Sequence, residues 1–555
     1  MRITTKIIQN NSLSNINTNK LLQDKLSQQM STEKKVNRPS DDPIVAIRAL
    51  RLRTNVNQVT QYYEKNVPDA ESWLEVTESA LSSMSEVVTD MIAQCTKGSN
   101  EDLTTADRET ILTALKALRD EVYSTGNADY AGRFIFTGYR TDTPLTFTDA
   151  KTQEYTITEQ IDNSKIDKIT YVDSGKILDI NESNFWHNGD NLDQNDQAMQ
   201  NENDFSDVVE TAVSRSDIYR IRLSYKDVDG FAENANGTLG IEIFDKAEVI
   251  DGVTTLKYKD ITTSNNYRVA SLYDQPNPYE AMTDGKPYEA GDGSKISDDD
   301  AIVLIKETGE LLLGKNVYDQ LMAKTDEPKT SYNEAEIRLN YKKSEWKNND
   351  LKPEHYFACS SEGIDYNQPY LQGISDEDKQ TIEYDVGLNQ RIRVNTTADE
   401  VFTHDISRDV EDMIKSMEDT VAMEKQVTKL KKMLEAEGDV ENRKVIETQL
   451  TAAEKAFTFL NEKTQQMFEN GITKMQKHLD AVNFAVTENG TRGQKLELIS
   501  NRLMSQKTNF ETLRSENEDI DITDVAIKLS SAELTYSSAL MATGKVLQNN
   551  LMNFI

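Results

Sequence analysis

The side chains best suited to chemistry in this sequence are four histidines, and their spacing argues against a catalytic or metal site. His187, His355, His404 and His478 lie far apart, with no pair four residues apart and no HExxH pattern that could hold zinc. The chain also lacks the GxxxxGK[ST] pattern that cradles phosphate, a GxGxxG pattern after a strand, and the GxSxG pattern around a nucleophilic serine. We therefore predict no catalytic, cofactor-binding or metal-binding residues and no cofactor, and we expect that the protein is not an enzyme.

Two clusters of charged side chains could hold an ion. The three aspartates at 298–300 could suggest calcium, but they lack the alternate-residue spacing and the terminal glutamate of an EF-hand loop, which favours a solvated turn. Lys34, Lys35 and Arg38 could suggest an anion site. In a chain this acidic, pairing within the chain or with a neighbouring subunit explains them better.

Charge and composition limit the class of protein and its partners. The chain has 555 residues, a formal net charge of −33, a hydrophobic share of 37%, and few prolines and glycines, 10 and 23. Such a profile favours long helices with narrow apolar stripes over a compact α/β enzyme. The acidity argues against nucleic acid or an anionic membrane as a partner, because either would require basic patches.

Cysteine usage and the N-terminal segment bear on redox state and targeting. Cys95 and Cys359 are far apart and belong to no metal-spaced set, so a disulfide framework is excluded and no bridge is expected. The first residues lack the apolar core and cleavage site of a Sec signal peptide, and no run approaches 18 apolar residues. We expect a chain that stays in the cytoplasm or leaves the cell without a cleaved signal.

The stretch from Asp521 to Ile555 predicts an amphipathic helix with one apolar seam. Apolar residues recur there at spacings of three and four, and Lys545 is the only charged residue after Glu533. A helix of this kind should not be stable alone, so we expect it to pack against the start of the chain and against neighbouring subunits. The predicted interface residues are Ile3, Ile7, Ile522, Val525, Leu529, Ala532, Tyr536, Ala539, Val546 and Leu551.

A break in the N-terminal helical pattern predicts a turn between two helices. Asp42 is a good N-cap and Pro43 suits the first helical position, so a helix begins there and the preceding residues turn. We expect this turn to join the terminal helices to the rest of the helical region. Its residues are Asn37, Arg38, Pro39, Asp41, Asp42 and Pro43.

Periodicity divides the remaining chain into helical, strand-rich and helical parts. Three–four spacing runs from Val56 to Met91, where Pro68 could kink the helix, and it resumes at Ile406. It passes through Gly490 and Gly493 without losing register, which favours a continuous helix there. Strand-like alternation or short apolar runs occur between these parts, at residues 219–225, 239–244, 301–305, 311–313 and 336–341.

The predicted fold is α+β: a long antiparallel helical or coiled-coil rod built from both chain ends, with a large β-rich domain inserted in the middle. We divide it into an N-terminal helix of a terminal domain (1–36), two halves of a rod domain (37–140 and 404–518), inserted β-rich variable domains (141–403) and a C-terminal helix of the terminal domain (519–555).

Several motifs resemble one family closely. They are MRITT at residues 1–5, NRPSDDP at 37–43, GRFIFTGYRTDTPLTF at 132–147, IEYDVGLNQR at 382–391 and the tail from Leu513 to Ile555. Together they resemble the bacterial flagellar hook-associated protein 3 family, the hook–filament junction proteins of the flagellin superfamily. The resemblance covers about residues 1–150 and 380–555 and is weak between them.

The resemblance implies a structural role and a set of partners. Members of this family form a ring that connects the hook to the flagellin filament, between hook-associated protein 1 and flagellin, and they are required for filament assembly and motility. It also implies secretion through the flagellar type III apparatus without a cleaved signal, a location outside the cell at the hook–filament junction, and an export chaperone bound to the C-terminal segment. The terminal segments would order only on assembly.

Two other functions remain open at this stage. Flagellins usually carry an NSAKDDA-type motif where this chain has NRPSDDP, and often a Leu-Leu-Arg-type end where this chain has Asn553-Phe554-Ile555, so a flagellin-like filament subunit is the second interpretation. The third is a secreted adhesin or hydrolase carried on a helical stalk, with its activity in residues 150–400.

Overall fold

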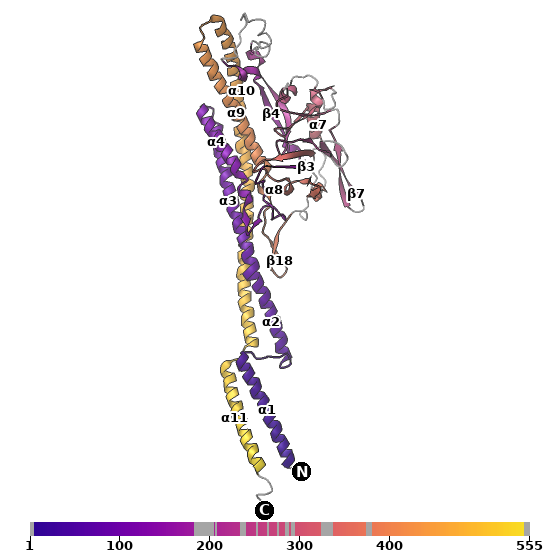
Figure 1. The fold of residues 1–555 in the computed structure, drawn as a ribbon, viewed down its shortest axis with the longest axis vertical. Helices are drawn as coiled ribbons and strands as arrows, with labels where there is room; N and C mark the ends of the chain where they lie inside the picture. The colour runs from indigo at the N-terminus through magenta and orange to yellow at the C-terminus, as the bar shows by residue number, and fades with distance from the viewer. Residues whose placement is uncertain are drawn as a thin grey trace, which may run out of the picture. The chain divides into compact units, whose positions relative to one another are not determined.

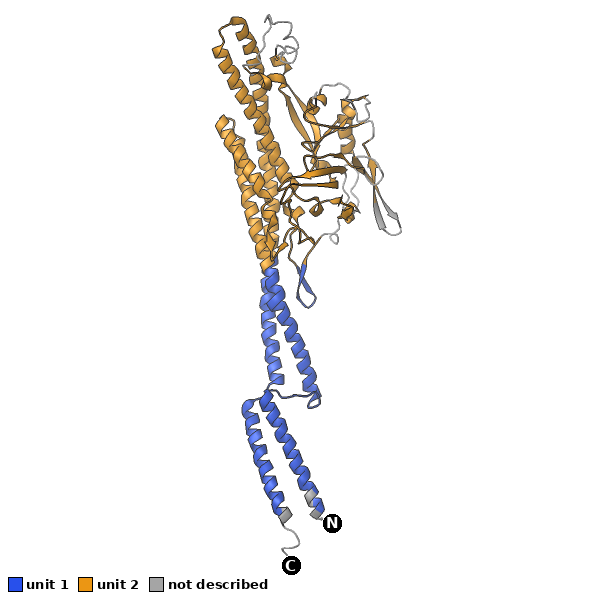
Figure 2. Cartoon of the chain, in the orientation of Figure 1, with its two compact units in different colours: residues 1–71, 383–392, 492–555 blue, residues 72–382, 393–491 orange. Residues whose placement is uncertain are grey.

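The structure is a computed structural model that describes residues 5–181, 205, 208–233, 240–250, 253–262, 266–274, 277–283, 288–289, 295–323, 337–372 and 380–548. The chain divides into two compact units (Figure 2). Unit 1 comprises residues 1–71, 383–392 and 492–555, and unit 2 comprises residues 72–382 and 393–491. The five-part division made from the sequence stays a prediction.

Helices occupy both ends of the chain and strands occupy the middle (Figure 1). The helices are α1 (Thr5–Thr32), α2 (Pro43–Gln61), a π-helical turn (Tyr62–Asn66), α3 (Val67–Gly98), α4 (Thr105–Val122), α6 (Pro278–Ala281), α7 (Lys315–Ala323), α8 (Ala398–Val401), α9 (His404–Ala436), α10 (Val440–Glu518) and α11 (Ile522–Gln548). The α+β class with a β-rich insertion between helical ends is therefore confirmed. Helix α10 also runs without a break through Gly490 and Gly493, as the preserved register predicted.

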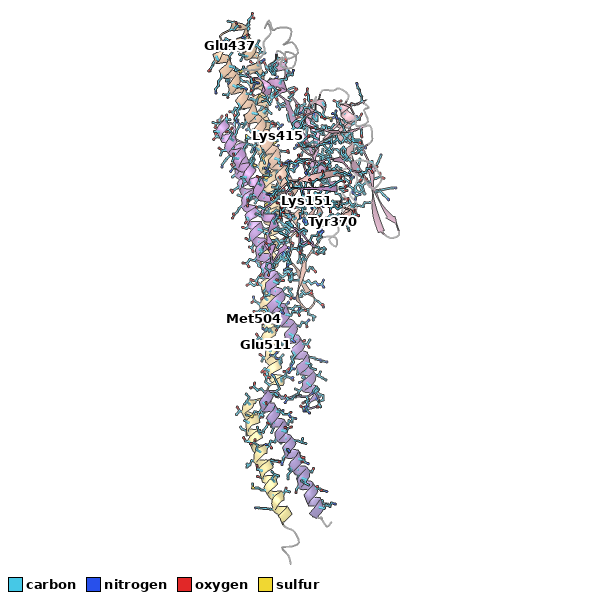
Figure 3. All side chains as sticks on the ribbon, viewed as in Figure 1. Lys151, Tyr370, Lys415, Glu437, Met504 and Glu511 are labelled. Carbon is cyan, nitrogen blue, oxygen red and sulfur yellow. The ribbon has the colours of Figure 1, made fainter. Side chains whose placement is uncertain are left out.

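Unit 1 pairs segments from the two ends of the chain. Helix α1 packs along α11, and α2 lies against the last turns of α10, where Asn517 Nδ2 donates to the carbonyl of Val45 at 3.2 Å. Val56 and Val59 of α2 are buried, as are Leu496 and Leu503 of α10. Other apolar side chains of this segment face solvent, such as Met504, labelled in Figure 3 and 54% exposed.

Local chemistry explains where the helices of unit 1 begin and bend. The Asp42 carboxylate accepts the N–H groups of Ile44 and Val45 at 3.0 and 3.1 Å, and Pro43 occupies the first helical position. Pro68 lacks an N–H, and its ring conflicts with the carbonyl one turn before it. The chain absorbs this conflict in the π-helical turn at Tyr62–Asn66 rather than by ending the helix.

Unit 2 contains a helical bundle made from the first and last thirds of the chain. The α3 residues with three–four spacing, among them Leu74, Leu81, Met84 and Met91, are almost fully buried. A polar contact sets the register of α3 against α10: Asn489 Nδ2 on α10 donates to the carbonyl of Leu74 on α3 at 2.9 Å. Helix α4 begins at a capping box made by Thr104 and Asp107 and packs on α9.

Two sheets form the β-rich part of unit 2. Their strands are β3 (Lys151–Ile161), β4 (Ile166–Asp173), β5 (Ser214–Arg222), β6 (Gly230–Phe231), β7 (Ile241–Ile250), β8 (Val253–Asp260), β9 (Tyr267–Ala270), β12 (Ile302–Ile305), β13 (Glu310–Leu313), β14 (Ile337–Trp346), β15 (Ala358–Ser361) and β16 (Ile364–Tyr366). One sheet has the order β4-β5-β13-β12-β9, and the other has the order β16-β15-β3-β14-β7-β8, with β6 also paired to β14. The five predicted strand segments fall on β5, β7, β12, β13 and β14, so those predictions are confirmed.

Three two-stranded hairpins complete the described strands: β1 (Asp129–Tyr130) with β2 (Arg133–Phe134), β10 (Tyr288–Glu289) with β11 (Lys295–Ile296), and β17 (Glu383–Gly387) with β18 (Gln390–Arg393).

The main core lies between the two larger sheets, where Ile302 and Leu304 of β12 pack with Tyr341 and Trp346 of β14. The alternate residues of β12, Val303 and Ile305, belong to a second cluster. Strand β12 is buried on both faces, which explains its unbroken apolar sequence.

Buried ion pairs fasten the five-stranded sheet to helix α9. Arg222 lies 2.6 Å from a carboxylate oxygen of Asp409 and 2.8 Å from one of Asp412, and Arg220 also pairs with Asp412. Burial alone would raise the pKa of Asp412, but the charges of Arg220 and Arg222 lower it to about 2. The positions of these charges therefore fix how strand β5 meets the helix.

Two buried histidines should make unit 2 sensitive to acid. Burial lowers the pKa of both His355 and His404 from 6.5 to about 3. Below about pH 6.5 the unfolded chain therefore binds more protons than the folded chain. As the pH is lowered, the free energy of unfolding should fall by up to about 1.4 kcal/mol per pH unit for each histidine. Urea titrations at several pH values between about 6.5 and 4 give the free energy of unfolding at each pH. This free energy should fall less steeply with decreasing pH for His355→Gln than for the wild type. An unchanged slope would contradict neutral burial of His355.

Candidate functional site

The candidate functional site is the terminal helix pair, made by α1 and α11 in unit 1. Helix α11 begins where Asp521 accepts the N–H groups of Thr523 and Asp524 at 2.9 and 3.2 Å. Asp524 then pairs with Lys528, one turn further along the helix. The helix start that the sequence predicted is therefore confirmed.

The apolar seam between the two helices is narrow. Its buried cluster consists of Leu26 from α1 with Val525 and Ala532 from α11, against which Ile520 and Leu529 pack. Because two of the three buried side chains are small or of medium size, the pair removes little apolar surface from water.

The predicted interface residues occupy different environments. Val525 and Ala532 are buried, whereas Leu529, Tyr536 and Ala539 are half-buried. Ile7 and Ile522 are 49% and 53% exposed. Val546 lies within α11, but its side chain is outside the described residues, as are Ile3 and Leu551. Whether these positions form an interface stays a prediction.

A second apolar surface on α11 was missed by the sequence analysis. Ile527, Leu534 and Met541 are 65%, 70% and 65% exposed and recur at seven-residue intervals. Ile527 follows Val525 by two residues, or about 200° around a helix, so this exposed stripe lies opposite the seam. Helix α1 likewise exposes Leu13 and Leu21, at 55% and 70%. The heptad spacing was visible in the sequence and could have predicted the stripe.

Ion pairs and backbone hydrogen bonds join α2 and the segment after α1 to the last residue of α10 and the residue after it, at one end of the terminal helix pair. Arg53 donates to both carboxylate oxygens of Glu518 at 2.7 and 2.8 Å, and Lys34 pairs with Asp519. The amide of Lys35 donates to the carbonyl of Glu518 at 2.7 Å. The hydrogen bond from Lys34 lowers the pKa of Asp519. Lys34 of the basic cluster therefore pairs within the chain, which is one of the two explanations that the sequence favoured.

The predicted turn residues form a local hydrogen-bond network next to these contacts in the sequence. The amide of Arg38 donates to Asp41 at 3.0 Å, and the amide of Asp41 donates back to the carbonyl of Arg38 at 2.9 Å. The Thr32 hydroxyl, at the end of α1, donates to Asn37 Oδ1 at 2.8 Å. Asp42 and Pro43 then begin α2, while Pro39 lies exposed in the turn. The structure therefore brings all six predicted turn residues together.

Potential metal ligands and thiols are two further kinds of chemical group among the described residues. They contain no group of three or more histidine, cysteine, aspartate or glutamate residues that could hold a metal ion. Cys95 and Cys359 are buried free thiols, and burial raises the pKa of each to about 12. Among these residues no helix is long and apolar enough to cross a membrane.

The seam makes a measurable prediction about the terminal helix pair. Leu26→Ala should destabilise the pairing of α1 with α11 by about 2–3 kcal/mol, because it removes most of a buried side chain from the cluster. Leu22→Ala is the matched control, since Leu22 lies on the same helix and is 48% exposed. Amide hydrogen exchange along α11 should accelerate in the first variant and not in the second. Equal rates in the two variants would contradict this packing.

Comparisons with known proteins agree with the motifs. Residues 3–141 match the bacterial flagellin N-terminal helical region. Flagellar hook-associated protein 3 of Salmonella typhimurium is 32% identical over 172 residues, covering 30% of this chain and 53% of that protein. A flagellin of Clostridium tyrobutyricum is 28% identical over 122 residues, covering 22% of this chain and 32% of that protein. The chain thus spans about half the length of the hook-associated relative and about a third of the length of the flagellin.

A solved structure of a putative flagellar hook-associated protein from Vibrio parahaemolyticus aligns with 86% of this chain and 100% of its own, at 13% identity and a TM-score of 0.32. The sequence matches confirm the resemblance that the motifs indicated: this chain is similar to flagellar hook-associated protein 3, in the flagellin superfamily.

Proposed function

We propose that the protein is a structural component of the bacterial flagellum, a hook-associated junction protein whose subunits form a ring between the hook and the flagellin filament. In this role it is required for filament assembly and motility and is not an enzyme. The observation that carries the proposal is the terminal helix pair, which buries a narrow seam and leaves a second apolar stripe exposed.

The exposed stripe supports association through the terminal helices. Heptad-spaced apolar residues on the outer face of a helix are the pattern that packs against another helix. The stripe carries no charge, in a chain whose net charge is −33, so it differs from the rest of the surface. Neighbouring copies of the same helices are the partner that this proposal assigns to Ile527, Leu534 and Met541.

The seam residues then have a different task from the stripe residues. Val525, Leu529, Ala532, Tyr536 and Ala539 hold α11 on α1 within a subunit. Ile7 and Ile522, exposed in the single chain, join the surface between subunits. Asn37, Arg38, Pro39, Asp41, Asp42 and Pro43 form the joint between α1 and α2.

The other partners follow from the resemblance. Hook-associated protein 1 would contact the ring on the hook side and flagellin on the filament side, and an export chaperone would hold the C-terminal segment beforehand. The protein would reach the junction, outside the cell, through the flagellar type III export apparatus without a cleaved signal peptide.

A flagellin-like filament subunit is the second candidate, because residues 3–141 match a region named for flagellins. The higher identity and longer alignment with hook-associated protein 3 favour the junction role. Abundance distinguishes the two functions: a filament subunit dominates the protein sheared from cells, whereas a junction protein is a trace component.

Deletion of residues 521–555 tests the role in the native host. Unit 2 has its own core and should remain folded, so the truncated protein should be soluble with an unchanged thermal unfolding transition for that unit. The cells should carry hooks without filaments and should not swim. Normal filaments on such cells would contradict the proposal.

A point variant isolates the exposed stripe from the fold of the subunit. Leu534→Asp should leave the purified monomer folded, because Leu534 is 70% exposed, yet should abolish filaments, since a charge would enter an apolar helix contact. Thr535→Asp is the matched control: it adds the same charge at the next exposed position, about 100° away around the helix. Motility counts and electron microscopy of the two strains should differ. The assignment of the stripe fails if both variants swim equally well.

A further inference from the structure

Helix α2 is basic in a strongly acidic chain. It contains three arginines and no acidic residue, whereas the net charge of the chain is −33. Arg53 is bonded to Glu518, but Arg48 and Arg51 are exposed and have no ion-pair partner among the residues that the structure describes. These two arginines are therefore available to bind another molecule.

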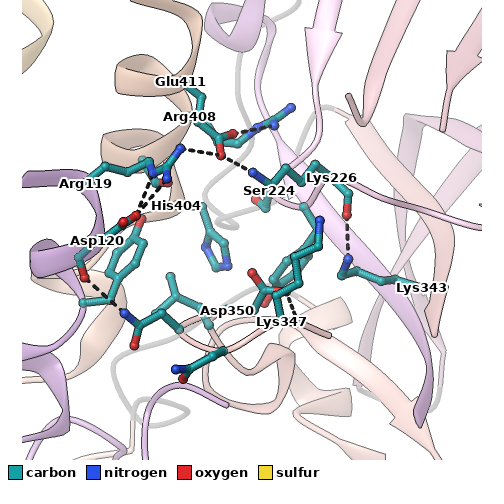
Figure 4. A pocket seen from close by; sticks show the side chains of 16 residues that line it. Arg119, Asp120, Ser224, Lys226, Lys343, Lys347, Asp350, His404, Arg408 and Glu411 are labelled. Carbon is teal, nitrogen blue, oxygen red and sulfur yellow. Dashed lines mark hydrogen bonds and ion pairs between the residues drawn. The ribbon is translucent and has the colours of Figure 1, made fainter. Parts of the chain in front are cut away.

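Cations around a polar pocket of unit 2 show the contrast. There Glu411 pairs with Lys226, with Arg408 at 3.2 Å and with Arg119 at 3.8 Å (Figure 4). These positive charges are offset within the chain, whereas the two arginines of α2 are not.

Exposed apolar side chains share the surface of the two arginines. Ile44, Ile47 and Leu50 are 67%, 53% and 60% exposed. At about 100° per residue, they lie with Arg48 and Arg51 within an arc of about 160° around α2. We call this surface the α2 face. It suits a partner that offers negative charge together with a surface that a helix can approach closely.

Helix α3 carries the complementary surface. It has six acidic residues and one lysine, which lies next to its last residue. Five of the carboxylates are exposed and have no ion-pair partner within the described part of the chain: Glu71, Glu75, Glu78, Glu86 and Asp90. They lie within an arc of about 120° around the helix, which we call the α3 face. Other exposed positions in this arc carry small side chains, at Ser79, Ser82, Thr89 and Ala93. Another helix can therefore approach the α3 face closely, because side-chain size sets the distance between packed helices.

The two faces cannot meet within one chain. Helix α2 continues through the π-helical turn into α3 without a loop, from Pro43 to Gly98. A continuous helix cannot fold back on itself. Opposite charges on its two parts can therefore pair with each other only between molecules.

We propose that the α2 face of one copy docks on the α3 face of a second copy. Arg48 and Arg51 would pair with carboxylates such as Glu75 and Glu78, and the apolar residues would pack over the small ones. When the two helices run parallel, each copy keeps one face free for the next copy, and such a heterologous contact closes into a ring or continues as a chain. This contact rests on the proposed function, since it presumes that copies assemble, but it uses residues other than the stripe on α11.

Cross-linking between copies of the full-length protein tests the contact. Thr54→Cys and Ser82→Cys place thiols at exposed positions within the two faces and remove no charge, and the native Cys95 and Cys359 are buried. The two variants, mixed and treated with a short bis-maleimide, should give about tenfold more cross-linked heterodimer by mass spectrometry than Thr54→Cys mixed with Thr458→Cys, at an exposed position of α10. The excess should be present at an ionic strength of about 0.01 M and lost at about 1 M, where charges are screened within about 3 Å. Equal yields from the two mixtures would overturn the proposal.

Charge reversal separates a specific contact from chance encounters. Arg48→Glu with Arg51→Glu, in the copy with the thiol on α2, should lower the yield about tenfold, because like charges would then face each other. Glu75→Lys with Glu78→Lys, in the copy with the thiol on α3, should restore the yield by making the faces complementary again. A yield that the first change does not lower, or that the second does not restore, would overturn the pairing of these faces.

Two further variants serve as controls. Lys431→Glu with Lys432→Glu, at exposed positions of α9, changes the net charge by the same amount as the arginine variant and should not alter the yield. Leu534→Asp disrupts the stripe on α11 and should also leave the yield unchanged. Loss of the cross-link in either control would overturn the assignment of the two faces. Because the cross-link is measured on purified protein, its failure would remove this contact without bearing on the filament test that deletes residues 521–555.

Discussion

The narrow contact between α1 and α11 is the constraint on which the order of both chain ends depends. Leu26, Val525 and Ala532 are the buried cluster of two helices of 28 and 27 residues. Helices in water derive most of their stability from packing an apolar face, and this face is small. Further apolar contacts would therefore stabilise the two chain ends, and the exposed stripe on α11 is a surface that can make them.

Unit 2 shows the opposite balance, because its parts are held by dense packing and buried charge. Arg222 bonds Asp409 and Asp412 of α9, and the sheet core around Trp346 is rich in stacked and edge-on aromatic rings. Buried ion pairs of this kind fix orientation more than they add stability, because desolvation offsets much of their attraction. The β-rich region is thereby kept in one geometry on its helices without help from another subunit.

Local signals predicted the helices and caps, whereas contacts between distant segments could not be predicted. Asp42, Pro43 and the apolar spacing of α3 act within a few residues, so the sequence pattern was sufficient for them. The parallel pairing of β9 with β12 and the bonds from Arg53 to Glu518 join residues whose separation no local pattern encodes. The π-helical turn at Tyr62–Asn66 is a compromise between Pro68 and continued packing, which spacing alone cannot reveal. The exposed stripe, in contrast, could have been predicted from the sequence, because Ile527, Leu534 and Met541 recur at strict seven-residue intervals.

The proposed assembly links folding to association, because the helix pair would complete its apolar contacts only with neighbouring copies. In that assembly, association of copies would supply the free energy that is missing in the single chain, so the order of the chain ends would depend on concentration and on the growing structure. The net charge of −33 acts in the other direction, because it keeps free subunits apart in solution. Association then requires the uncharged stripes to meet in register, which a template of already assembled subunits provides and a random encounter does not. The proposed junction role needs this combination, since such a subunit must remain separate until it reaches the end of the structure that it extends.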